Sequence, residues 1–227
     1  MKAKNLVLII AVAVILSISS RQTVRAGGPP SSATTGAGTA NVTGEVKFEG
    51  SVPKAIPINM AADPSCAKQH PTPVLNQGVM ADASGALQNV VVFIADGLGE
   101  RKFDPPSQPA IIEQKGCLYE PHVLALQANQ PMEVVNHDPT SHNIHATPAN
   151  NREWNKAEPP GTKINEAFPR EEIAIPVKGN VHPWMRSYVA VFKHPYFAVP
   201  ARRQLRSEQS AAGHLHHFSL ARKTGDS

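Results

Sequence analysis

Short apolar runs, some alternating with polar residues and some continuous, recur along most of the chain. Residues 42–48 alternate apolar and polar, which is typical of a strand with one buried face. Residues 90–94 are apolar throughout, which favours a central strand. Further short strands are expected at 110–112, 122–126, 132–135, 173–177 and 188–192.

The stretches between these runs are expected to be irregular. Residues 53–73, which include Cys66, carry no clear period, and residues 148–161 are polar and rich in proline. No span of eleven or more residues shows a convincing helical period of 3.6. The pattern therefore predicts an all-β fold, an antiparallel β-sandwich.

The N-terminus departs from the strand pattern. Lys2 and Lys4 precede an apolar run over 6–18, and Val-Arg-Ala at 24–26 offers a small-residue cleavage site. Residues 1–26 are therefore predicted to be a signal peptide, with a periplasmic or secreted product. The alternative is an uncleaved N-terminal anchor.

The rest of the chain divides by composition. Residues 27–40 are Gly, Pro, Ser, Thr and Ala, as in a flexible linker. Residues 41–199 hold the predicted strands and form the sandwich domain. The chain has 21 prolines and only 5% aromatic residues, which suits short strands joined by many turns.

The net charge of +4 is concentrated at the N-terminus. Lys2, Lys4, Arg21 and Arg25 carry four positive charges with no acid among them, so the remainder sums to zero. A nucleic-acid partner is therefore not expected, nor is an integral membrane span after cleavage of the signal peptide.

The chain has two cysteines, Cys66 and Cys117. In an exported protein such a pair suggests a disulfide, and the alternative is two unpaired buried thiols. No nucleophile elbow, phosphate loop, pair of catalytic acids or zinc-binding spacing is present, so an enzyme is not expected.

Two segments carry the candidate chemistry. Residues 136–145 read Asn-His-Asp-Pro-Thr-Ser-His-Asn-Ile-His, and residues 179–186 read Gly-Asn-Val-His-Pro-Trp-Met-Arg. A blue-copper site needs two imidazoles, one thiolate and a long axial thioether. His142 lies in the first segment, and His182 and Met185 lie in the second, which together provide three of these four ligands.

On these two segments the chain resembles the cupredoxins, most closely the amicyanin-like members. Their ligand loop has the form Cys-x-x-His-Pro-x-Met-Arg, and their first ligand lies in Asn-x-(Asp/Glu)-x-x-x-His-Asn-x-His. The resemblance implies a Greek-key β-sandwich, one mononuclear copper site and one-electron transfer to a redox partner protein. It implies His142 and His182 as equatorial ligands, Met185 as the axial ligand, and Asn143 as the residue that ties the two segments together.

The chain departs from the family pattern at Gly179, where the thiolate ligand is expected. A set of two histidines and one methionine would bind Cu(I), or Cu(II) weakly with a water, without the intense thiolate-to-copper absorption band. Cys66 and Cys117 lie on other segments and are not expected to replace the missing thiolate. A Cys codon and a Gly codon can differ by one base, so a mutation or a sequencing error is one explanation of Gly179.

Three flanking segments extend the resemblance to exported bacterial cupredoxin-domain proteins of the methylamine-utilisation or carboxypeptidase-regulatory-like type. They are residues 114–117, 121–123 and 194–197. The other histidines considered are expected to be structural: His70, His122, His137 and His194. The rival interpretation is a metal-free β-sandwich that acts as a binding or structural module of the cell envelope.

The resemblance ends near Pro200, and residues 200–227 fit no strand or helix pattern. Back-translated and read one base later, residues 204–226 can spell N-F-E-V-S-N-L-P-P-G-T-Y-T-I-S-A-W-H-E-K-L-G-T. That string contains the Leu-Pro-x-Gly-x-Tyr and Trp-His-Glu elements expected of the family. The hypothesis is a single frameshift near Val199 or Pro200, which would remove two strands that pair near 42–48.

Overall fold

The computed structural model describes residues 42–199, 205–206 and 218–221. The predicted signal peptide, the predicted linker and most of the predicted aberrant tail lie outside the described residues. In this part of the chain no helix is long and apolar enough to cross a membrane.

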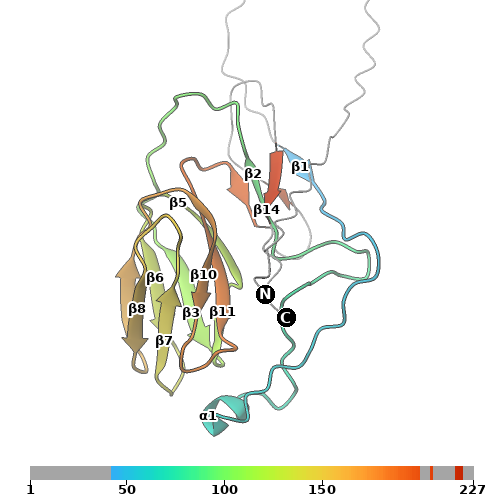
Figure 1. Cartoon of the computed structure of the whole chain (residues 1–227), viewed down its shortest axis with the longest axis vertical. Helices are drawn as coiled ribbons and strands as arrows, with labels where there is room; N and C mark the ends of the chain where they lie inside the picture. Colours follow the sequence, from blue (N-terminus) through green and yellow to red (C-terminus); the bar gives the residue numbers. More distant parts are fainter. Residues whose placement is uncertain (1–41, 200–204, 207–217, 222–227) are drawn as a thin grey trace, which may run out of the picture.

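Two facing sheets form the body of the molecule (Figure 1). The larger sheet has five strands in the order β5 (Val123–Gln127), β11 (Arg186–Phe192), β10 (Glu172–Lys178), β7 (His142–Ala146) and β8 (Trp154–Glu158). The smaller has four strands in the order β4 (Leu118–Glu120), β3 (Ala110–Lys115), β6 (Met132–Asn136) and β9 (Lys163–Glu166).

The core lies between these sheets. It combines side chains of the smaller sheet, such as Ile112 and Val134, with side chains of the larger sheet, such as Ile144 and Val189, all fully buried. Burial of one face of each sheet explains the alternation seen along β6 and β10. The predicted β-sandwich is confirmed.

The pairing is mixed rather than purely antiparallel. β3 pairs with β6 in parallel, and β5 pairs with β11 in parallel, while the other pairs are antiparallel. Parallel neighbours need a long connection, and each of these pairs is separated along the chain by strands of the opposite sheet.

Two smaller pairings lie beside the sandwich. β12 (Phe197–Ala198), β2 (Val91–Ile94) and β14 (Phe218–Ala221) form one sheet with β2 in its centre, as the apolar run predicts. β1 (Thr43–Gly44) pairs with β13 (Leu205–Arg206). The prediction of no strand after residue 200 is therefore wrong at these two places. The strand predicted at 42–48 shortens to β1 and a bridge between Lys47 and Ala86.

Two stretches predicted to be irregular contain regular structure. β8 lies within 148–161, where its burial alternates and it pairs along its whole length with β7. Helix α1 (Pro64–Ala67) lies within 53–73. Asp63 caps it by accepting from the Ser65 amide, and Pro64 follows at the first helical position, so local capping rather than periodicity specifies this helix.

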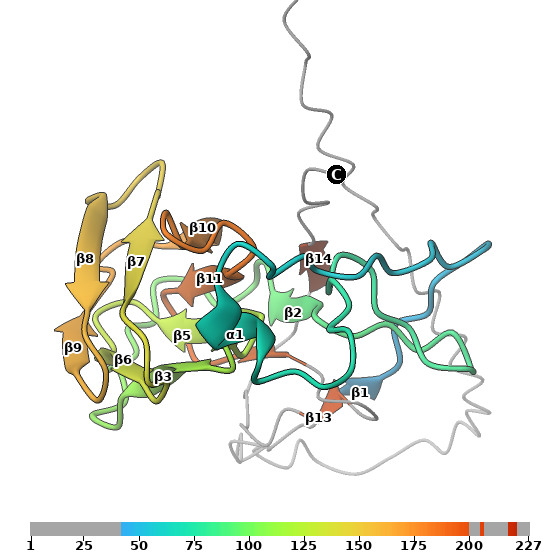
Figure 2. The ribbon, with the colours of Figure 1, turned by 90° about the horizontal axis from the view of Figure 1, so that it is seen from below.

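A disulfide joins Cys66 of α1 to Cys117 in the turn between β3 and β4, which confirms the predicted bridge. Both cysteines are fully buried. The bridge holds α1 against one end of the sandwich, below the sheets in Figure 1 and in front of the strand ends in Figure 2.

Candidate metal centre

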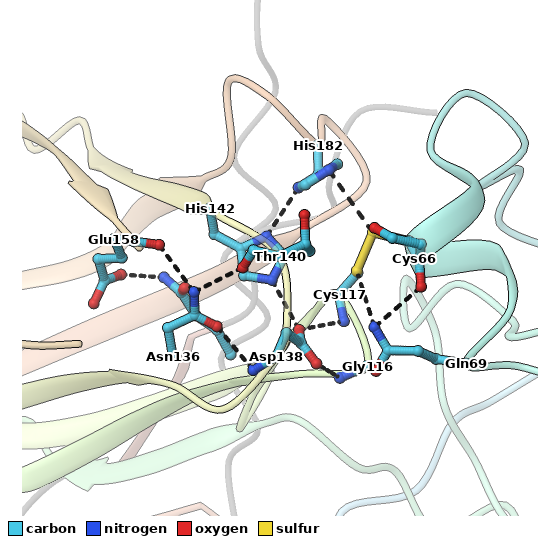
Figure 3. Close-up of polar contacts among 12 residues, drawn as sticks. Cys66, Gln69, Gly116, Cys117, Asn136, Asp138, Thr140, His142, Glu158 and His182 are labelled. Atoms are coloured by element: carbon cyan, nitrogen blue, oxygen red, sulfur yellow. Dashed lines mark hydrogen bonds and ion pairs between the residues drawn. A yellow bond between two sulfur atoms is a disulfide. The ribbon is translucent and has the colours of Figure 1, made fainter. Parts of the chain in front are cut away.

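Two buried histidines meet at the end of the sandwich that α1 covers. His142 is the first residue of β7, and His182 lies in the loop between β10 and β11. Their Nδ1 atoms lie 2.9 Å apart, and each residue is 2% exposed (Figure 3). The structure therefore brings together the two predicted equatorial ligands from separate parts of the sheet.

A carboxylate binds the outer nitrogen of each ring. Asp138 Oδ2 lies 2.8 Å from His142 Nε2, and Asp63 Oδ2 lies 2.8 Å from His182 Nε2. Hydrogen bonds from Ser65 and from His182 hold the pKa of the Asp63 carboxyl well below its usual range. Asp63 is therefore ionised at neutral pH.

Asp138 is ionised for a similar reason. Burial alone would raise the pKa of Asp138, but hydrogen bonds from His142 and from the backbone amides of Cys117 and Gly116 outweigh it and lower that pKa. Both amides donate to the carboxylate at 2.7 Å. Asn136 supports this turn, because its Oδ1 accepts from the Asp138 amide and its Nδ2 donates to the Thr140 carbonyl.

The two carboxylates fix the tautomers of the rings. An ionised carboxylate can only accept, so the Nε2 atoms of His142 and His182 carry the protons. The two Nδ1 atoms then face each other at hydrogen-bond distance, 2.9 Å, in a buried site. A metal cation could bind both Nδ1 atoms in place of the proton that this contact shares, and carboxylate-supported imidazoles are a common arrangement around protein-bound metals.

The ligand loop closes tightly around Met185. The Gly179 amide donates to the Met185 carbonyl, and the Met185 amide donates to the His182 carbonyl, both at 2.9 Å. Met185 is fully buried, and its Cβ lies 3.4 Å from the position that a Cβ on Gly179 would occupy. These contacts involve the backbone and Cβ of Met185. The role of its sulfur as an axial metal ligand remains a prediction.

Gly179 leaves no room for a side chain in this loop. A Cβ at this position would lie 2.6 Å from the carbonyl oxygen of His182, closer than real Cβ contacts come. A cysteine here would require the His182 carbonyl to move. The loop as folded is thus matched to glycine.

Asn143 ties the two ligand segments together, as predicted. Its Oδ1 accepts from the amides of Asn180 and Val181 at 2.8 and 3.0 Å, and its Nδ2 donates to Asn155 Oδ1 at 2.9 Å. The residue after the first ligand therefore holds the start of the loop that carries the second.

Sequence reasoning missed the two carboxylates that bind the histidines. Asp138 belongs to the quoted 136–145 motif, but its role was not assigned. Asp63 is 119 residues from His182, so only its capping pattern is visible in sequence. Sequence reasoning also gave no sign that Cys66 lies beside His182, where its sulfur is 3.7 Å from Nε2. As half of a disulfide, that sulfur is not a thiolate ligand.

The other histidines make local contacts, in agreement with the structural roles predicted for them. His70 Nε2 lies 2.6 Å from the Gly116 carbonyl, and His122 Nδ1 lies 3.0 Å from the Arg186 carbonyl. His137 lies 3.4 Å from Glu113, and His194 accepts from the Tyr196 amide.

Comparisons with known proteins identify no family. No family model matches the chain, and no curated protein matches it. Among solved structures, a Cu-containing nitrite reductase (NirK) from Thermus scotoductus SA-01 has 16% identity and a TM-score of 0.36, covering 44% of this chain and 25% of that one. A purple cupredoxin from Nitrosopumilus maritimus has 21% identity and a TM-score of 0.32, covering 36% and 98%.

A mutant amicyanin in the Cu(I) form has 17% identity and a TM-score of 0.33, covering 44% of this chain and 97% of that one. The chain thus spans only a quarter of the nitrite reductase's length. At these levels of similarity, the fold class rests on the strand pairings of the chain itself, and the candidate metal centre rests on its own geometry.

Proposed function

We propose that this protein binds one copper ion between His142 and His182, with Met185 as a weak axial ligand, and carries single electrons to a redox partner protein. The observation that carries the proposal is the pair of facing Nδ1 atoms at 2.9 Å, each on a ring whose other nitrogen binds a carboxylate. Copper, when bound, supplies the one-electron couple.

The residues of the chain would keep this centre rigid. Asp138 and Asp63 fix the orientation of the two rings, and Asn143 fixes the start of the ligand loop. Trp184 packs against His182 with ring centroids 5.1 Å apart, and its indole donates to the Cys117 carbonyl. A rigid, water-poor shell would limit reorganisation when the charge changes.

An exported location belongs to the same proposal. The predicted signal peptide and the disulfide both suit an oxidising compartment, such as the periplasm or the extracellular space. Because position 179 is glycine and both cysteines are bonded to each other, the Cu(II) form should lack an intense thiolate band.

Copper titration of the purified oxidised protein tests the proposal. We expect one equivalent of Cu(I) to bind tightly, and His182→Ala to abolish tight binding. His137→Ala is the matched control, because His137 is exposed and its side chain lies against the surface residue Glu113. No stoichiometric binding, or equal binding by His182→Ala, would contradict the proposal.

One observation favours a second candidate, a metal-free binding module of the cell envelope. The loop leaves no space for the thiolate at position 179. A groove lined by residues 56–59, residues 76–78 and β11 would then be the surface that binds a partner or a carbohydrate. Under this alternative, copper does not bind stoichiometrically to the wild-type protein.

A further inference from the structure

The disulfide lies on the Nε2 edge of His182, on the side of the ring away from the facing Nδ1 atoms. Cys66 Sγ is 3.7 Å from His182 Nε2 (Figure 3). Asp63 Oδ2 is 2.8 Å from the same nitrogen. The donor atoms of Asp63, Cys66 and His182 all lie within 4.8 Å of one another. Cys117 Sγ is bonded to Cys66 Sγ at 2.03 Å, so a fourth donor adjoins the group.

We propose that reduction of this disulfide creates a second metal site, in which Cys66, Cys117, His182 and Asp63 bind a zinc ion. Two sulfurs, one imidazole and one carboxylate are donors typical of Zn²⁺. Tetrahedral zinc, with its usual bond lengths, places a sulfur and a nitrogen ligand about 3.6 Å apart. The observed 3.7 Å between Cys66 Sγ and His182 Nε2 matches that separation.

The surroundings suit a thiolate pair. Both cysteines are fully buried, and Gln69 Nε2 lies 3.7 Å from Cys117 Sγ as a hydrogen-bond donor. α1 carries Cys66 and is capped by Asp63, so one short segment supplies two of the four donors. For all four to bind one ion, the two sulfurs must separate and Cys117 Sγ, which in the oxidised form lies near Asp138 and His142, must approach the other three donors.

The chemistry balances with a dithiol as the reductant. The dithiol gives two electrons and two protons to the S–S bond, forms its own cyclic disulfide and leaves two thiols on the protein. Zn²⁺ then displaces both thiol protons to solvent. The proton on His182 Nε2 moves to Nδ1, where it can be donated to the bare Nδ1 of His142.

The evidence for this site does not rest on the copper proposal, because the site uses the other nitrogen of His182 and does not use His142 or Met185. The two sites nevertheless exclude each other. Zinc on Nε2 places a proton on Nδ1, so the position proposed for copper closes when the second site fills. The disulfide would then control which metal the protein holds.

Competition for Zn²⁺ against a chromophoric chelator tests the inference. The protein is reduced with a dithiol, freed of it under anaerobic conditions and compared with the oxidised protein. We expect one tight equivalent of Zn²⁺ in the reduced form only, with a rise in its Tm on zinc binding. Circular dichroism of the reduced apoprotein checks that the strands remain.

Four variants make the result specific. Cys66→Ser should abolish tight zinc binding, and Asp63→Ala should weaken it at least about tenfold. His142→Ala should keep zinc binding but lose copper, which separates the failure of one proposal from the failure of the other. Equal zinc binding by oxidised and reduced protein, or no effect of Asp63→Ala and His182→Ala, would overturn the inference. Zinc binding that is unaffected by Asp63→Ala and His182→Ala is also the result expected if zinc binds only the thiols of unfolded protein.

Discussion

Replacing Asn143 with alanine should loosen the loop that carries His182 and Met185. The amides of Asn180 and Val181 would lose their shared acceptor, the Asn143 Oδ1. A hydrogen bond of this kind contributes about 0.5–1.5 kcal/mol net, so the loss of two should lower the free energy of unfolding by about 2 kcal/mol. Asn143 is 8% exposed, so water replaces the lost acceptor poorly.

The assay is urea denaturation of wild type, Asn143→Ala and Asn155→Ala. Asn155→Ala is the control, because it removes the partner of Asn143 Nδ2 but leaves both loop hydrogen bonds intact. We expect the control to change stability by no more than about 0.5 kcal/mol. If both variants lose the same stability, Asn143 does not act through the loop, and the reasoning fails.

Three other changes test separate features. Gly179→Cys should destabilise the apoprotein, because the new Cβ would displace the His182 carbonyl; an unchanged urea midpoint would contradict this. With copper bound, the same variant should show an intense visible band from its thiolate. Reducing the disulfide, which spans 51 residues, should lower stability by about 4 kcal/mol, seen as a lower Tm without zinc. Burial lowers the pKa of His194, whose unprotonated Nδ1 accepts a hydrogen bond from the Tyr196 amide. The free energy of unfolding should therefore fall as the pH drops below about 6.5, the ordinary pKa of histidine in the unfolded chain. His194→Gln should flatten that dependence in urea denaturation from about pH 5 to about pH 8.

Sequence patterns predicted the parts of the fold that depend on local alternation or on apolar runs. β2, β5, β6, β10 and β11 all lie within or beside the expected ranges. β8 was missed because its residues are polar on the exposed face, and its pairing with β7 rather than its own propensity makes it a strand. α1 was missed because four residues are too few to show a helical period.

The candidate site likewise contains residues that a local pattern indicated and residues that only the folded structure brings in. His142, His182 and Asn143 were singled out because two short segments resemble the ligand motifs of a known family, and each segment carries its own signal. Asp63 and Cys66 could not be placed, because they approach His182 only through tertiary contacts across 119 and 116 residues. No local pattern in residues 53–73 indicates which histidine they approach.

That long separation also bears on the order in which the molecule assembles. Contacts between residues far apart in sequence carry a high entropic cost and form late. Asp63, whose carboxylate orients His182, is synthesised 119 residues before that histidine. It can contact His182 only after β10, the ligand loop and β11 have been synthesised. The candidate metal centre should therefore be among the last parts of the domain to form, and metal binding there, if the proposal holds, would report that the whole domain has folded.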